Sequence, residues 1–125
     1  TPRPGKRGGA FCSNIHPIKQ SRVLSNFDGS FSNLTTLAHE LGHAYHGYQL
    51  KEESILNSRY PMPLAETASI FCETIVVNAA LKQATKQEKI AILESSISDA
   101  GQVIVDIFSR FLFEKAICGL FKFKG

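Results

Sequence analysis

Apolar residues recur at helical spacing along most of the chain, and the first stretch with this pattern predicts a helix over about residues 34–50. Asn33 or Thr35 is expected to be its N-cap. The apolar positions share one face and the histidines lie opposite them, so we expect a core side and a polar side. The apolar face comprises Leu34, Leu37, Leu41, Ala44 and Tyr48, and the polar face His39, His43 and His46.

A second helix is predicted over 63–84, where the residues are apolar nearly all round, so we expect it to be buried on several sides. Glu66 and Glu73 are the exceptions, and their spacing places them on the same face. A buried carboxylate must be paired, hydrogen-bonded or bound to a metal. A salt bridge from Glu66 to an Arg or Lys elsewhere is the structural alternative to metal binding.

The rest of the chain completes a mainly helical α+β prediction. Residues 11–33 contain β-favouring pieces and an Asp28-Gly29 turn, which predict a strand or an irregular hairpin. Residues 86–121 show helical spacing after a possible capping box, and predict one long packing helix or two in line, with Gly101 as a possible bend. We therefore expect a single domain over 1–125. Its parts are an irregular or β segment (1–33), the helix with the three histidines (34–50), an antiparallel helix with Glu66 and Glu73, called the glutamate helix (63–84), and the packing helix (86–121). The helix over 34–50 is the candidate metal helix.

Composition narrows the possible partners and compartment. The 125 residues are 43% hydrophobic, enough for a core, and the net charge of +3 is mild, with no basic stripe for nucleic acid. Without a long uncharged apolar run, no membrane partner is expected. Three distant cysteines form no C-x-x-C pair, so we expect small buried thiols and a reducing compartment. The sequence opens without Met or a signal peptide, and we expect it to be an internal piece of a longer protein.

The candidate chemistry centres on His39-Glu40-Leu41-Gly42-His43, an H-E-x-x-H motif within the first predicted helix. The two imidazoles differ by only about 40° in heading and leave one face a turn apart, an arrangement that Zn²⁺ accepts from ligands on adjacent turns. Glu40 then lies beside the metal, where a general base can reach a water. Gly42 costs about 1 kcal/mol against Ala in mid-helix, which indicates close approach of another backbone or a ligand.

Glu66 is the most economical third ligand for such a site. Two His and one Glu leave a coordination position for water, the pattern of a catalytic zinc centre. Glu40 would remove the proton from the water and deliver it to the leaving amine. His46 and Glu73 are candidates for orienting the imidazoles from outside the ligand set.

Two other classes of protein compete with this interpretation. One is a helical module that binds metal or peptide without turnover. The other is a di-iron carboxylate bundle, because Glu40-Leu41-Gly42-His43 is also E-x-x-H. That bundle needs a second E-x-x-H, which neither Glu66 nor Glu73 begins, since Ser69 and Val76 stand three residues further on.

The stretch H-E-L-G-H-A-Y-H (39–46) followed by P-M-P-L-A-E-T-A-S-I-F-C-E (61–73) closely resembles the oligoendopeptidase F branch of the thimet oligopeptidase family of zinc oligopeptidases. K-R-G-G-A-F-C (6–12) and the F-D-G turn (27–29) resemble it too. The resemblance implies a zincin-like core, one zinc ion held by His39, His43 and Glu66, Glu40 as base, and short peptides as substrates in the bacterial cytoplasm. It also implies that residues near 22–27 form an edge strand to which an extended peptide adds.

The resemblance also indicates what this piece lacks. Family members are several times longer, close their cleft with two helical lobes, and stabilise the oxyanion with a later segment that bears His and Tyr. Loss of an oxyanion donor costs about 10²–10³ in turnover. We therefore expect the piece alone to bind zinc but to cleave slowly or not at all, and to self-associate through surfaces meant for the missing lobes.

Overall fold

The computed structural model describes residues 4–6 and 8–120, and it confirms a mainly helical fold with one small sheet. The chain forms two compact units, Thr1–Lys82 and Gln83–Gly125, and each is described by itself. The prediction of a single domain is not tested by this division and stays a prediction.

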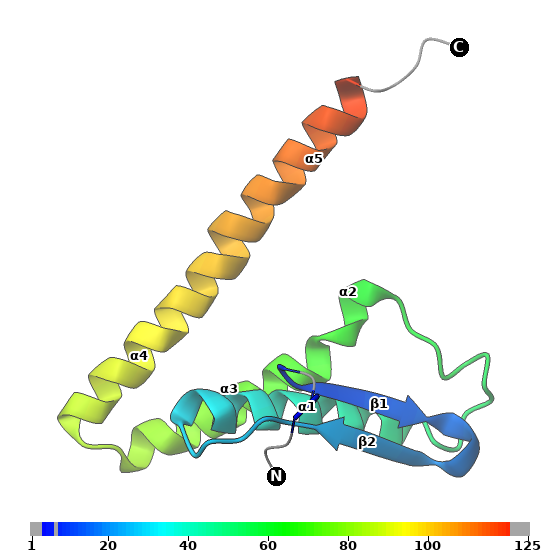
Figure 1. The fold of residues 1–125 in the computed structure, drawn as a ribbon, viewed down its shortest axis with the longest axis horizontal. Helices are drawn as coiled ribbons and strands as arrows, with labels where there is room; N and C mark the ends of the chain where they lie inside the picture. The colour runs from blue at the N-terminus through cyan, green and yellow to red at the C-terminus, as the bar shows by residue number, and fades with distance from the viewer. Residues whose placement is uncertain (1–3, 7, 121–125) are drawn as a thin grey trace. The chain divides into compact units, whose positions relative to one another are not determined.

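The sheet in the first unit is an antiparallel hairpin of β1 (Phe11–Ile15) and β2 (Gln20–Leu24), in which Phe11 lies opposite Leu24 (Figure 1). The chain reverses through a 3₁₀ turn that ends at Lys19, whose φ is 52°. The predicted hairpin is therefore present, but its turn is not at Asp28-Gly29. Those two residues instead lead into the next helix, because the Asp28 carboxylate accepts a hydrogen bond from the Ser30 N–H at 2.8 Å.

Helix α1 (Phe31–Gln49) begins three residues earlier than predicted, and its N-cap is Ser30, not Asn33 or Thr35. Ser30 Oγ accepts a hydrogen bond from the Asn33 N–H at 3.2 Å, while Asn33 Oδ1 accepts one from the Asp28 N–H at 2.7 Å. These bonds satisfy N–H groups at the helix start that have no partner within the helix. The hydrogen bonds from Ser30 also hold the pKa of Asp28 below its usual value.

The predicted glutamate helix is two helices, α2 (Met62–Ala65) and α3 (Thr67–Gln83), which meet at Glu66. Glu66 keeps near-helical angles (φ −87°, ψ −3°), so the chain turns there without a loop. From this point α3 runs back in the opposite direction to α1, which confirms the predicted antiparallel arrangement (Figure 1).

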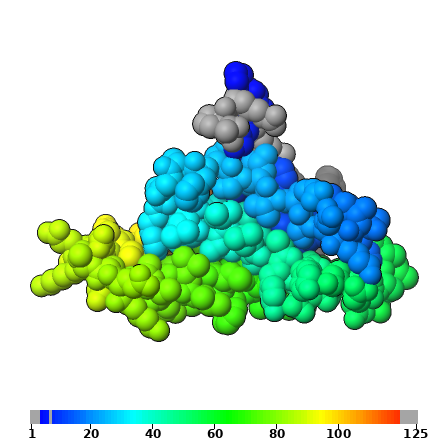
Figure 2. Space-filling view, turned by 90° about the horizontal axis from the view of Figure 1, so that it is seen from below, coloured from blue at the N-terminus to red at the C-terminus, as the bar shows by residue number. Residues whose placement is uncertain are grey.

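Helix α1 lies between the hairpin and α3, so the first unit has three layers (Figure 2). Ala38 is buried in α1, and two glycines allow its neighbours to approach closely. A Cβ at Gly42 would lie 2.5 Å from Ser69 Cα, and one at Gly47 would overlap the Asn14 side chain. The predicted close approach at Gly42 is thus a backbone contact with α3.

Much of the apolar surface expected to be buried is exposed within the described residues. In α3 only Ser69 is buried, and the side chains of Ile70, Phe71 and Ile75 are more than half exposed. Leu34, Leu41 and Tyr48 of α1 are also exposed, and Lys51 Nζ lies 3.7 Å from the Tyr48 ring centroid. The prediction of core positions was wrong for these residues, because no other layer among the described residues of the first unit covers them.

By length and composition alone, Met62–Gln83 is apolar enough to cross a membrane, with a mean hydropathy of 1.4. One such segment is weak evidence for a span. It contains Glu66 and Glu73, whose carboxylates contact His39 of α1. We therefore interpret Met62–Gln83 as a segment whose two carboxylates contact α1. The expectation of no membrane partner stays a prediction.

The second unit is a continuous helical stretch of α4 (Lys86–Gly101), a π-helical turn (Gln102–Ile107) and α5 (Phe108–Leu120). The predicted capping box is present, because Thr85 Oγ1 accepts from the Glu88 N–H and the Glu88 carboxylate accepts from the Thr85 N–H. Gly101 has helical angles (φ −61°, ψ −41°), and the hydrogen-bonding pattern changes immediately after it. The predicted end at residue 121 lies outside the described residues, and the packing role stays a prediction.

The three cysteines are free thiols, as expected, but they are not buried as predicted. Cys12 and Cys72 are partly buried, whereas Cys118 is exposed on α5. The interpretation of all three as small core residues was therefore wrong.

Candidate metal centre

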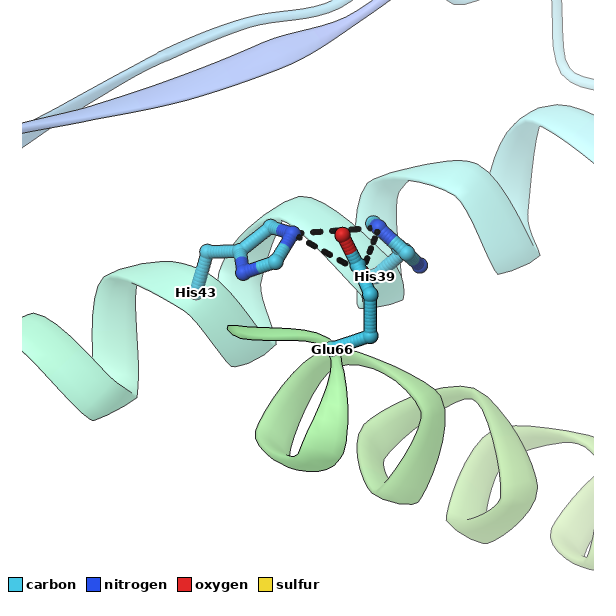
Figure 3. Close-up of side chains that lie close together, drawn as sticks. All are labelled: His39, His43 and Glu66. Carbon is cyan, nitrogen blue, oxygen red and sulfur yellow. Dashed lines mark hydrogen bonds and ion pairs between the residues drawn. The ribbon is translucent and has the colours of Figure 1, made fainter. Parts of the chain in front are cut away.

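His39, His43 and Glu66 converge on one point between α1 and the start of α3 (Figure 3). The spacing of the two histidines on α1 brings their Nε2 atoms to 3.1 Å from each other. Glu66 Oε2 lies 3.1 Å from His39 Nε2 and 3.4 Å from His43 Nε2. The structure thus brings together the three residues that the sequence singled out.

The distances among these three atoms fit a single divalent ion. Zinc binds His nitrogen and carboxylate oxygen at about 2.0–2.2 Å, so tetrahedral ligands lie about 3.3–3.5 Å from each other. The observed separations of 3.1 to 3.4 Å are close to that spacing. Among the described residues Glu66 forms no ion pair with Lys or Arg, which removes the structural alternative for this carboxylate.

Glu73 contacts the same histidine from the opposite side of the ring. One of its carboxylate oxygens is hydrogen-bonded to His39 Nδ1, across the two helices. When Nδ1 carries the proton and donates to Glu73, neutral His39 presents the lone pair of Nε2 toward His43 and Glu66. This is the contact that fixes the tautomer of a metal-binding histidine, as predicted for Glu73.

Glu40 follows His39 on α1 and is buried, with 7% of its surface exposed. Its heading differs from that of the two histidines by about a quarter turn. Burial, and in second place the negative charge of Glu40, raises the pKa of the Cys12 thiol on β1. Glu40 is therefore close to the hairpin, beside the three converging residues and not among them.

His46 does not contact the centre, so the prediction that it orients the imidazoles is wrong for the described residues. Its ring stacks on Tyr60, with 4.2 Å between the ring centroids and 17° between the planes. Its Nδ1 is buried and has no hydrogen-bond partner among the described residues. His46 lies one turn beyond His43, where α1 meets the segment that leads to α2.

Ser69 contacts the centre and was not identified from the sequence. It is fully buried where α3 crosses Gly42, and its hydroxyl lies 2.7 Å from Glu66 Oε2. Its position three residues after Glu66 in a helix was an available signal, since Ser hydroxyls bond to groups one turn earlier.

A pocket of about 610 Å³ lies elsewhere in the first unit, between the hairpin, the C-terminal half of α1 and the segment that follows it. None of the three converging residues lines it. The centre therefore lies outside this pocket.

Comparisons with known proteins identify the family to which the chain belongs. The model of Peptidase family M3 matches residues 1–123. An oligoendopeptidase F homolog of Borreliella burgdorferi is 33% identical over 87% of this chain, which covers 18% of that relative. The chromosomal oligoendopeptidase F of Lactococcus lactis subsp. cremoris is 35% identical over 71% of the chain and 15% of its own length. Oligopeptidase PepF of Bacillus subtilis is 34% identical over 58% of the chain and 11% of its own length.

The chain belongs to Peptidase family M3, and the curated relatives place it in the oligoendopeptidase F branch. It spans less than a fifth of the length of these relatives. No solved structure matches the chain.

Proposed function

We propose that this chain carries the catalytic centre of a zinc-dependent endopeptidase that hydrolyses short oligopeptides. The observation that supports this most strongly is the convergence of one ligand atom each from His39, His43 and Glu66, all within 4.8 Å of one another. Two imidazoles and one carboxylate form the protein ligand set of catalytic zinc sites that keep a position open.

The side chains of the centre have separate roles in this proposal. A bound zinc ion would supply Lewis acidity, which lowers the pKa of a water and polarises a carbonyl. His39, His43 and Glu66 would hold the ion, and Glu73 would keep His39 in the required tautomer. Glu40 would accept the proton of the attacking water and deliver it to the leaving amine.

The hairpin offers a place for an extended substrate. β2 pairs with β1 along one edge, and no other described strand pairs with its second edge. Residues 22–24 of the predicted edge strand belong to β2, while residues 25–27 lie beyond its end. We propose that a peptide adds to this hairpin by backbone hydrogen bonds, close to Glu40.

We further propose that the protein acts in a reducing compartment, the cytoplasm, because Cys12, Cys72 and Cys118 are free thiols. A secretory location would instead favour pairing of such residues.

One observation favours a second candidate, binding of metal and peptide without turnover. The described His residues outside the centre are engaged elsewhere: His46 stacks on Tyr60, and His16 is hydrogen-bonded to the backbone oxygen of Glu53. A side chain that donates a hydrogen bond to the oxyanion would be needed for fast turnover, and loss of one such donor costs about 10²–10³ in rate.

Cleavage of an internally quenched peptide separates the two candidates. The zinc-loaded protein should cleave it, and Glu40→Gln should bind zinc equally well but lose about 10²–10⁴ of the rate, the usual contribution of acid–base catalysis. Equal rates for the two proteins would remove Glu40 from its role. Zinc binding with no cleavage above the rate of free zinc would support the binding module.

A further inference from the structure

We propose that Ser69 is a positioning residue for the Glu66 carboxylate, an inference that rests on the metal centre proposed above. Ser69 is the only side chain among the described residues of α3 that is fully buried, with 0% of its surface exposed. Its Oγ lies 2.7 Å from Glu66 Oε2 and 2.9 Å from the Glu66 backbone oxygen. A serine hydroxyl has one proton to donate, so these two acceptors compete for it.

The carboxylate is the acceptor that needs the hydroxyl. The backbone oxygen of Glu66 already accepts a hydrogen bond from the Ile70 N–H at 3.0 Å. A hydrogen bond to an ionised carboxylate is also stronger than one to a neutral carbonyl. Donation to Oε2 is therefore the favoured state of the Ser69 hydroxyl.

This hydrogen bond determines where the carboxylate points. Oε2 is the same oxygen that lies 3.1 and 3.4 Å from the two imidazole nitrogens. The Glu66 side chain is 46% exposed and, without a partner on its own helix, would lose rotamer freedom to reach this position. Ser69 thus prepares Glu66 for the ion and leaves further lone pairs of the carboxylate free to bind it.

Ser69 is itself fixed by the crossing of α1 and α3. A Cβ at Gly42 would lie 2.5 Å from Ser69 Cα and 2.6 Å from Ala68 O, so only glycine allows the helices this close. Gly42 lies between His39 and His43 on the same helix. The backbone contact therefore links the helix of the two histidines to the residue that orients the third ligand.

The test is a zinc competition titration against a chromophoric chelator, combined with urea unfolding of the metal-free proteins. We expect Ser69→Ala to weaken zinc binding by about 10- to 100-fold, the usual effect of losing a group that orients a ligand. Thr74→Ala is the matched control, because the Thr74 hydroxyl donates only to the backbone oxygen of Ile70 on the same helix. It should change zinc affinity less than about twofold, a shift far below that range.

A double-mutant comparison separates positioning from general damage to the crossing. In a Glu66→Ala background, Ser69→Ala should cause no further loss of zinc affinity, because its effect acts through Glu66. An equal loss in both backgrounds would overturn the proposal, and so would unchanged affinity in the single variant. If Ser69→Ala does not fold, Ser69→Cys keeps a side chain of similar size with a weaker donor and is expected to weaken binding in the same direction.

Failure of the metal centre gives a different result. Wild-type protein that binds no zinc, or Glu66→Ala that binds it as tightly as wild type, would overturn the centre and the role of Ser69 with it. Zinc binding that needs Glu66 but ignores Ser69 would overturn only the positioning role.

Discussion

His39 is hydrogen-bonded through Nδ1 to Glu73, a residue of a different helix, while its Nε2 faces Glu66 Oε2 at 3.1 Å. The two carboxylates therefore contact the same imidazole at its two nitrogens. Glu66 and Glu73 are seven residues apart and both project from the α2–α3 segment toward α1. One side of the ring is thus used to set its orientation, and the other side is free for an ion.

This arrangement predicts that Glu73→Ala weakens zinc binding without abolishing it. Loss of the carboxylate frees the His39 ring and its tautomer, and such changes cost about 10- to 100-fold in metal affinity. Chelator competition measures the change, and Glu94→Ala, which removes an exposed carboxylate of α4, is the control. Equal affinities for the two variants would show that Glu73 does not orient His39.

Alanine substitution of Gly42 tests the close crossing of α1 and α3, and Gly101, a helical glycine of the second unit, is the control. A Cβ at Gly42 would meet backbone atoms at 2.5 and 2.6 Å, so Gly42→Ala should lower the free energy of unfolding by about 1–3 kcal/mol or more. Nothing lies within 4 Å of a Cβ at Gly101, which is also helical, so Gly101→Ala should stabilise its helix by up to about 1 kcal/mol. Urea unfolding followed by far-UV circular dichroism measures both, and a tolerated alanine at Gly42 would contradict the close crossing.

The N-cap of α1 gives a local prediction. Ser30→Ala removes the acceptor for the Asn33 N–H and should lower the free energy of unfolding by about 1 kcal/mol. Ser32→Ala, in the first turn, removes an exposed hydroxyl that caps nothing and should change stability by less than about 0.5 kcal/mol. Denaturant unfolding of the two variants compares them, and the same stability for both would exclude Ser30 as the cap.

Cys12 should report the charge of Glu40. The thiolate is the species that reacts with alkylating reagents, and burial together with the Glu40 carboxylate raises the Cys12 pKa. Cys12 should therefore be alkylated half-maximally at a higher pH than an unperturbed thiol. Glu40→Gln removes the negative charge, so this midpoint should move to lower pH while burial keeps part of the shift.

The labelling is followed by peptide mass spectrometry on metal-free protein, with exposed Cys118 as an internal reference. The profile of Cys118 should be the same in both proteins. A Cys12 profile that does not move would place the Glu40 carboxylate away from the hairpin.

The sequence predicted the parts of the centre that depend on helical periodicity or on unusual residue types. His39 and His43 had to share a face because of their spacing, and Glu66 and Glu73 stood out as the carboxylates of an apolar helix. Gly42 indicated a close approach, and the structure shows the backbone of Ala68 and Ser69 there. These inferences required only local geometry.

The features that were mispredicted depend on specific hydrogen bonds or on other layers of the fold. The start of α1 depends on Asp28 and Ser30, whereas the sequence pattern predicted a hairpin turn at Asp28-Gly29. The stacking of His46 on Tyr60 needs the path of the segment after α1, which periodicity does not give. Periodicity identifies apolar faces that are expected to be buried, such as the one with Leu41, but it does not identify the layer that buries them.

The most direct test of the metal centre is anomalous X-ray diffraction at the zinc edge from crystals of zinc-loaded protein. We expect one peak, with His39 Nε2 and His43 Nε2 at about 2.0–2.1 Å and a Glu66 oxygen at about 2.0–2.2 Å. A peak on His16 or His46, or a zinc ion that Glu66 does not reach, would contradict the assignment.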